Sequence, residues 1–132
     1  MVLPPPGEIA RAARLAAAAA VVVTTALVFA TAGDRPWQSV AAVVMISLLP
    51  YVAFVALARW ASGVVLAEAA VLGGLVLAVS FAVGMYGLAF VVAPDERTVS
   101  APLAVPLLQS VAVGGAGAGA ALFKWRARRA AP

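Results

Sequence analysis

Apolar residues in this chain are gathered into four long stretches, and the charged residues lie in short clusters between and beyond them. The stretches cover about residues 14–32, 38–58, 64–93 and 103–123. Each is close to or above the roughly 20 residues with which an α-helix crosses the hydrocarbon core of a bilayer. Because a helix satisfies its own backbone polar groups in lipid, the pattern predicts four transmembrane helices.

Two other architectures do not fit this pattern. A membrane β-barrel needs segments of about ten residues in which polar and apolar positions alternate, whereas these stretches are continuous runs of Ala, Val and Leu. A soluble domain of 132 residues has too little interior to bury four of them. We therefore expect an all-α, integral membrane four-helix bundle over residues 14–123. A tail and an interfacial helix start (residues 1–13) precede it, and a basic tail (residues 124–132) follows it.

The positions of the basic residues predict the orientation. The connections are short, so neighbouring helices should be antiparallel, in an up-down-up-down order. With both termini on one side, that side holds seven basic residues and the other side holds Arg35 and Arg97. The seven are Arg11, Arg14, Arg59, Lys124, Arg126, Arg128 and Arg129. The positive-inside rule then places both termini in the cytoplasm, and the Ala- and Val-rich composition favours a bacterial inner membrane.

The first stretch admits a second interpretation. Two arginines, an apolar run from Leu15 to Phe29 and the sequence Ala-Thr-Ala at 30–32 resemble a secretory signal peptide with its cleavage site. The apolar run is at or beyond the upper length of a signal peptide, so we expect an uncleaved first span.

Prolines and length modify two other stretches. Pro50 lies inside the second one, where it removes a backbone donor and predicts a kink. The third stretch is longer than a perpendicular helix needs and should tilt. The sequence 94–97 ends it, and Pro102 and Pro106 should flank the start of the fourth span.

The composition excludes several kinds of chemistry. The chain has no Cys and no His, which rules out disulfides, thiol redox chemistry and His-ligated haem or zinc. Asp95 and Glu96 are adjacent carboxylates, but a solvated turn is the expected role of such a pair. We expect no enzyme and no cofactor. The net charge of +4 does not indicate nucleic acid, because the basic residues lie beside the spans, where they set topology and bind anionic lipid.

Glu68 is the acidic residue inside a predicted span, and burying a carboxylate is costly unless it is paired. It lies about four residues, or roughly 6 Å, into the third stretch, and Arg59 across the turn is a plausible partner. An interfacial salt bridge is one interpretation. A proton- or cation-coupling carboxylate, or a contact to a partner subunit, is the other.

The fourth stretch carries Gln109 and Ser110, and Tyr86 lies at a similar depth in the third. A hydrogen bond between Gln109 and Tyr86 would hold two helices together. A substrate contact is the alternative.

Glycines at helical spacing mark possible packing faces. Gly115 and Gly119 form a small-xxx-small pair with Gly114 beside them, and Gly74 and Gly84 follow small residues at the same spacing in the third stretch. Such faces let helix backbones approach closely in lipid. They serve packing within the bundle, or docking onto another protein or a second copy.

Lys124, Arg126, Arg128 and Arg129 lie where the fourth span ends and should contact anionic lipid headgroups or a partner. The size and four-span layout resemble small multidrug-resistance transporters, which carry a glutamate in the first span, where this chain has no acidic residue. Layout alone identifies no family. The sequence therefore favours a non-catalytic accessory or structural subunit of a larger membrane complex. The alternative is a small homo-oligomeric transporter or channel that uses Glu68 and Gln109.

Overall fold

The computed structural model describes residue 5 and residues 7–30, 33–87 and 101–130, which form four α-helices. The helices are α1 (Glu8–Ala30), α2 (Trp37–Ala61), α3 (Val65–Gly87) and α4 (Ala101–Ala130). Each is long and apolar enough to cross a membrane, as a small membrane protein requires. The end of the third stretch beyond residue 87, and the loop with Asp95, Glu96 and Arg97, lie outside the described residues.

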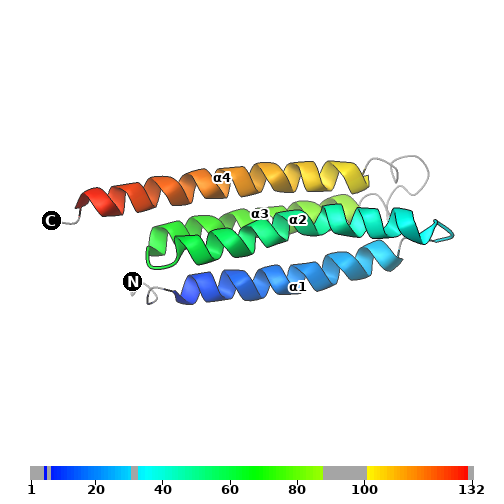
Figure 1. Ribbon diagram of the computed structural model, residues 1–132, viewed down its shortest axis with the longest axis horizontal. Helices are drawn as coiled ribbons and strands as arrows, with labels where there is room; N and C mark the ends of the chain where they lie inside the picture. Colours follow the sequence, from blue (N-terminus) through cyan, green and yellow to red (C-terminus); the bar gives the residue numbers. More distant parts are fainter. Residues whose placement is uncertain (1–4, 6, 31–32, 88–100, 131–132) are drawn as a thin grey trace.

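The helices lie side by side along one axis, with α2 and α3 in the middle and α1 and α4 on opposite sides (Figure 1). The starts of α1 and α3 and the ends of α2 and α4 share one end of the bundle (Figure 1). The contact between α3 and α4 is the most extensive, followed by that between α1 and α2. Each outer helix packs against both central helices.

Two helix boundaries differ from the sequence-based expectation. Helix α4 continues to Ala130 rather than ending near residue 123, so most of the expected tail is helical. Ala, Lys and Arg are strong helix formers, and basic residues in the last turn interact favourably with the helix dipole. Helix α4 also begins at Ala101, which places Pro106 inside the helix rather than at its start. Helix α2 runs through Pro50 as one helix, and the kink there remains a prediction.

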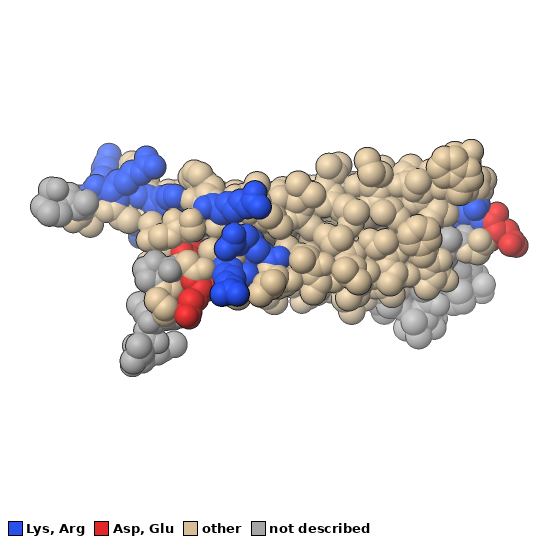
Figure 2. Space-filling model, turned by 60° about the horizontal axis from the view of Figure 1, so that its bottom comes forward, with Lys and Arg blue, Asp and Glu red and all other residues tan. Residues whose placement is uncertain are grey.

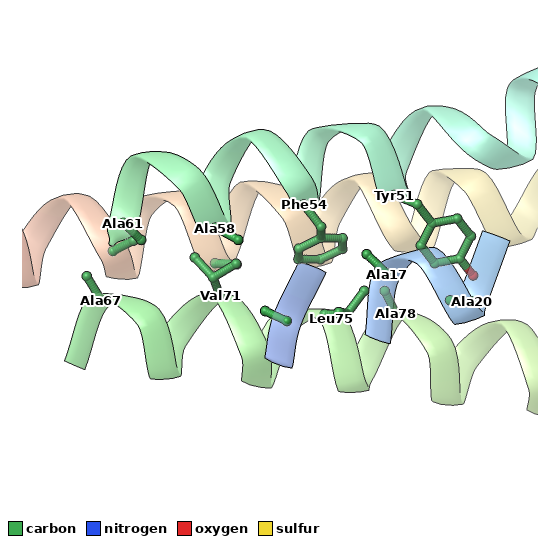
Figure 3. Packing of buried hydrophobic residues seen from close by; sticks show 13 residues of the cluster. Ala17, Ala20, Tyr51, Phe54, Ala58, Ala61, Ala67, Val71, Leu75 and Ala78 are labelled. Atoms are coloured by element: carbon green, nitrogen blue, oxygen red, sulfur yellow. The ribbon is translucent and has the colours of Figure 1, made fainter. Parts of the chain in front are cut away.

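The core is built mainly from alanine. Ala17, Ala58 and Ala78 are completely buried, and Tyr51 and Phe54 of α2 fill the space between the helices. Figure 3 shows these alanines at successive positions along the space between α1, α2 and α3, with the rings of Tyr51 and Phe54 projecting from α2 into the same space. Many other large apolar side chains point outward, as expected for helices in lipid. The small core side chains let the backbones approach closely.

Candidate functional site

Glu68 is completely buried in the first turn of α3, where its carboxylate binds backbone amides of two other segments. The Gly63 amide donates to Oε1 (2.8 Å), and the Ala10 amide donates to Oε2 (3.1 Å). The Gly7 amide donates to both oxygens, at 2.9 and 3.1 Å. The carboxylate therefore joins the start of α1 to the turn between α2 and α3.

The local sequence explains why this carboxylate is needed. Gly7 is the N-cap of α1, since its carbonyl accepts the bond from the Arg11 amide (2.9 Å). A helix start normally receives acceptors from its own N-cap and third residues. Here those residues are Gly7 and Ala10, which have no side-chain acceptor. Glu68 supplies the missing acceptors from another helix, and its negative charge is favourable at the positive end of the α1 dipole.

This arrangement differs from the expected pairing with Arg59. The hydrogen bonds of the Glu68 carboxylate go to three backbone amides. The Arg59 carbonyl accepts a bond from Ser62 in the turn (2.7 Å). A buried carboxylate with all of its bonds directed at fixed backbone donors stabilises the helix ends. That role needs no change of protonation.

A second polar cluster links all four helices in the apolar interior. The Gln109 side-chain nitrogen of α4 donates to the Tyr51 hydroxyl of α2 (2.9 Å) and to the Ala78 carbonyl of α3 (3.4 Å). The Tyr51 hydroxyl also lies 3.1 Å from the Thr24 hydroxyl of α1. Gln109 is completely buried, and its Oε1 has no hydrogen-bond partner among the described residues. We name Thr24, Tyr51 and Gln109 the central cluster.

The other sequence-predicted polar residues lie apart from the central cluster. Tyr86 is buried and its hydroxyl lies 3.5 Å from that of Ser47, so Gln109 and Tyr86 bond to different residues of α2. The Ser110 hydroxyl donates to the carbonyl of Pro106, one turn earlier in its own helix (2.8 Å). The hydrogen bond of the Ser110 hydroxyl therefore lies within α4.

The predicted glycines separate into two groups. A Cβ on Gly74 would lie 2.6 Å from the Ala116 Cβ, and a Cβ on Gly119 would lie 3.4 Å from the Ala70 Cβ, so both positions serve the contact between α3 and α4. No atom of the described residues lies within 4 Å of a Cβ added to Gly84, Gly114 or Gly115. These three face away from the bundle interior.

An outward-facing groove runs between α3 and α4. It has a volume of about 560 Å³. Its lining includes the exposed glycines Gly73 and Gly115 and exposed apolar side chains such as Phe81 and Val111. Its ten lining residues are Ala70, Gly73, Gly74, Leu77, Phe81, Leu108, Val111, Ala112, Gly115 and Ala116. We name this surface the α3–α4 groove.

Basic residues gather at the end of the bundle where α1 and α3 begin. Figure 2 shows their side chains at that end, a broad surface without charged residues along the middle, and a small charged group at the other end. Lys124 donates to the Trp60 carbonyl and lies 4.8 Å from the centre of the Trp60 ring. The Arg129 guanidinium lies 3.8 Å from the centre of the Trp125 ring. Arg126 and Arg128 are exposed.

Sequence reasoning missed several residues that the structure makes important. Tyr51 and Thr24 complete the central cluster, and the Gly7 and Gly63 amides bind Glu68. Gly73 lies next to Gly74 in the sequence, but an added Cβ there would have no described atom within 4 Å. The lack of a side-chain acceptor at the N-cap and third residues of α1, Gly7 and Ala10, was an available signal for the missing cap. No known protein family, curated protein or solved structure matches this chain.

Proposed function

We propose that this protein is a non-catalytic accessory subunit of a larger membrane complex, and that its α3–α4 groove receives a transmembrane helix of a partner protein. The protein crosses a bacterial inner membrane in an up-down-up-down order with both termini in the cytoplasm. The concentration of basic residues at one end of the bundle supports this orientation through the positive-inside rule (Figure 2).

The main support for the proposal is that the groove exposes glycines that are not required for helix packing within the bundle. Gly74 is needed inside, where Ala116 leaves no room for a Cβ. An added Cβ on Gly73 or Gly115 would have no atom within 4 Å in the described part of the chain. A glycine within a helix costs about 1 kcal/mol relative to alanine, so these two weaken their helices without improving internal packing. A partner helix that packs closely on them supplies a physical reason for the glycines.

The polar residues support an accessory role over transport. Glu68 and Gln109 are the residues that a transport path would use. The Glu68 carboxylate accepts hydrogen bonds from backbone amides, and Gln109 is completely buried in the central cluster. Neither side chain lines the α3–α4 groove. The geometry thus favours a structural use for both.

The test is to solubilise native membranes gently, purify the full-length protein by a C-terminal tag, and measure the intact complex by native mass spectrometry. We expect a defined complex with a larger membrane protein. Gly115→Leu fills the groove and should remove the partner. Gly114→Leu is the matched control, because it is the adjacent glycine, is equally open and lies outside the groove.

Two results contradict the proposal. A hetero-complex that survives Gly115→Leu places the partner on another surface. A homo-oligomer without other chains favours the transporter or channel interpretation, and flux measurements on Glu68→Gln in liposomes would then follow.

A further inference from the structure

A lateral pocket opens between α1 and α3, on the side of the bundle away from α4. Its volume is about 450 Å³, within the roughly 300–1,000 Å³ of small-molecule sites. Apolar side chains form most of its wall, and the hydroxyl-bearing residues that line it are Thr24 of α1, Tyr51 of α2 and Ser80 of α3. A mostly apolar pocket with a few polar groups is the usual form of a ligand site.

The hydrogen bonds of the central cluster leave one hydroxyl hydrogen unused at this wall. The Ala78 carbonyl only accepts, so the Gln109 atom beside it is the nitrogen, and this nitrogen donates to Tyr51. The contact between Thr24 and Tyr51 uses one of their two hydroxyl hydrogens. Among the described residues neither hydroxyl has a further partner, so the second hydrogen has no acceptor there. Tyr51 is completely buried and Thr24 is 3% exposed, so Thr24 is the member of the pair that reaches the pocket. Figure 3 shows the Tyr51 oxygen turned toward α1 beside Ala20, another residue of the pocket wall.

The depth of this hydroxyl pair limits what can bind to it. Thr24 lies about 24 Å along α1 from Glu8 and about 9 Å before Ala30, at 1.5 Å per residue. A helix of this length covers the hydrocarbon core of about 30 Å, which places Thr24 inside that core. The ester groups of phospholipids lie at the edge of the core, whereas an apolar molecule dissolved in it can carry its acceptor to this depth.

We propose that the pocket between α1 and α3 binds an apolar, bilayer-dissolved molecule with a ring carbonyl, of the quinone class, and that the Thr24–Tyr51 pair donates a hydrogen bond to that carbonyl. The ring lies among Ala19, Val79 and Val83, and the carbonyl lies at the hydroxyl wall. This site is separate from the α3–α4 groove, since the two surfaces share no lining residue. The proposal therefore does not depend on the accessory function.

The test compares two bicyclic probes of similar shape. Full-length protein in detergent is titrated calorimetrically with 2-methyl-1,4-naphthoquinone and with 2-methylnaphthalene, which lacks both carbonyls, and empty micelles give the blank. The chain has no cysteine for the quinone to modify. A hydrogen bond contributes about 0.5–1.5 kcal/mol, so the quinone should bind about 2–12-fold more tightly than the hydrocarbon. The infrared carbonyl stretch of the bound quinone should move to lower frequency.

Three variants assign the preference to the pocket. Thr24→Val removes one hydroxyl at nearly constant volume and should reduce the quinone preference, with hydrocarbon binding unchanged. Thr25→Val is the matched control on the same helix, outside the pocket lining, and should behave as the wild type. Ala19→Leu fills the pocket from an exposed position and should abolish binding of both probes.

Specific results overturn the proposal. Equal affinity for the two probes in the wild type, with no shift of the carbonyl stretch, would show that the hydroxyl pair donates no hydrogen bond to the quinone carbonyl. Binding that survives Ala19→Leu would place the ligand elsewhere. These results do not depend on the stability of Thr24→Val, because the first uses the unaltered protein and the second changes a lipid-facing alanine.

Discussion

Glu68→Gln is the substitution that tests most directly how the bundle end is held together. The carboxylate accepts bonds from the amides of Gly7, Ala10 and Gly63. The amide side chain of Gln has the same shape, but one of its two terminal atoms donates. If the NH₂ group replaces Oε2, the Ala10 amide loses its acceptor, and if it replaces Oε1, the Gly63 amide does. Either orientation leaves a backbone donor facing another donor.

The expected loss of stability follows from the interactions that Glu68→Gln removes. A buried donor without a partner costs about 1–3 kcal/mol. Loss of the charge at the start of α1 adds about 0.3–1 kcal/mol. Glu68→Gln should thus lower the free energy of unfolding by about 1–4 kcal/mol, a large part of the roughly 5–15 kcal/mol that stabilises a typical domain. Glu68→Ala removes the acceptor of all three amides and should be more destabilising still.

The assay is reversible unfolding of the full-length protein in mixed micelles, followed by far-UV circular dichroism. Glu8→Gln is the matched control, since Glu8 is an exposed acid in the first turn of α1 at the same end of the bundle. Glu8→Gln should change stability by less than about 1 kcal/mol. Hydrogen exchange should accelerate at the Ala10 or Gly63 amide in Glu68→Gln only. Equal stability of the two variants, with unchanged exchange, would refute the capping role.

Two further pairs of substitutions test the packing of the helices. Gly74→Ala should destabilise the bundle by about 1–3 kcal/mol through overpacking against Ala116. Gly73→Ala should be neutral or stabilising by up to about 1 kcal/mol. Thermal unfolding measures both variants. Equal effects on stability would contradict the assignment of Gly74 to the inward face of α3 and of Gly73 to its outward face. Tyr51→Phe and Gln109→Leu should each cost about 0.6–2 kcal/mol. A double-mutant cycle in the same micelles should give a coupling of at least about 0.6 kcal/mol, whereas additive effects would show that the Tyr51–Gln109 contact contributes nothing.

The sequence by itself determined the four helices. Whether a segment suits lipid depends on the length and polarity of that segment alone, so the apolar stretches located α1 to α4 without knowledge of their neighbours. The sequence also identified Glu68 and Gln109 as unusual, because a buried polar group is costly wherever it lies. The end of α4 was harder to place, since helical propensity continues after hydrophobicity stops.

The partners of those polar residues were decided by the tertiary structure. Glu68 binds backbone amides, which every residue carries, so side-chain types gave no signal for Gly7 or Gly63. Gln109 bonds Tyr51 rather than the expected Tyr86, because the rotation and axial position of packed helices determine which tyrosine it reaches. Nor could the sequence tell which of Gly73 and Gly74 faces inward. In a helix that is apolar on all sides, only contact with its neighbours distinguishes the core face from the lipid face.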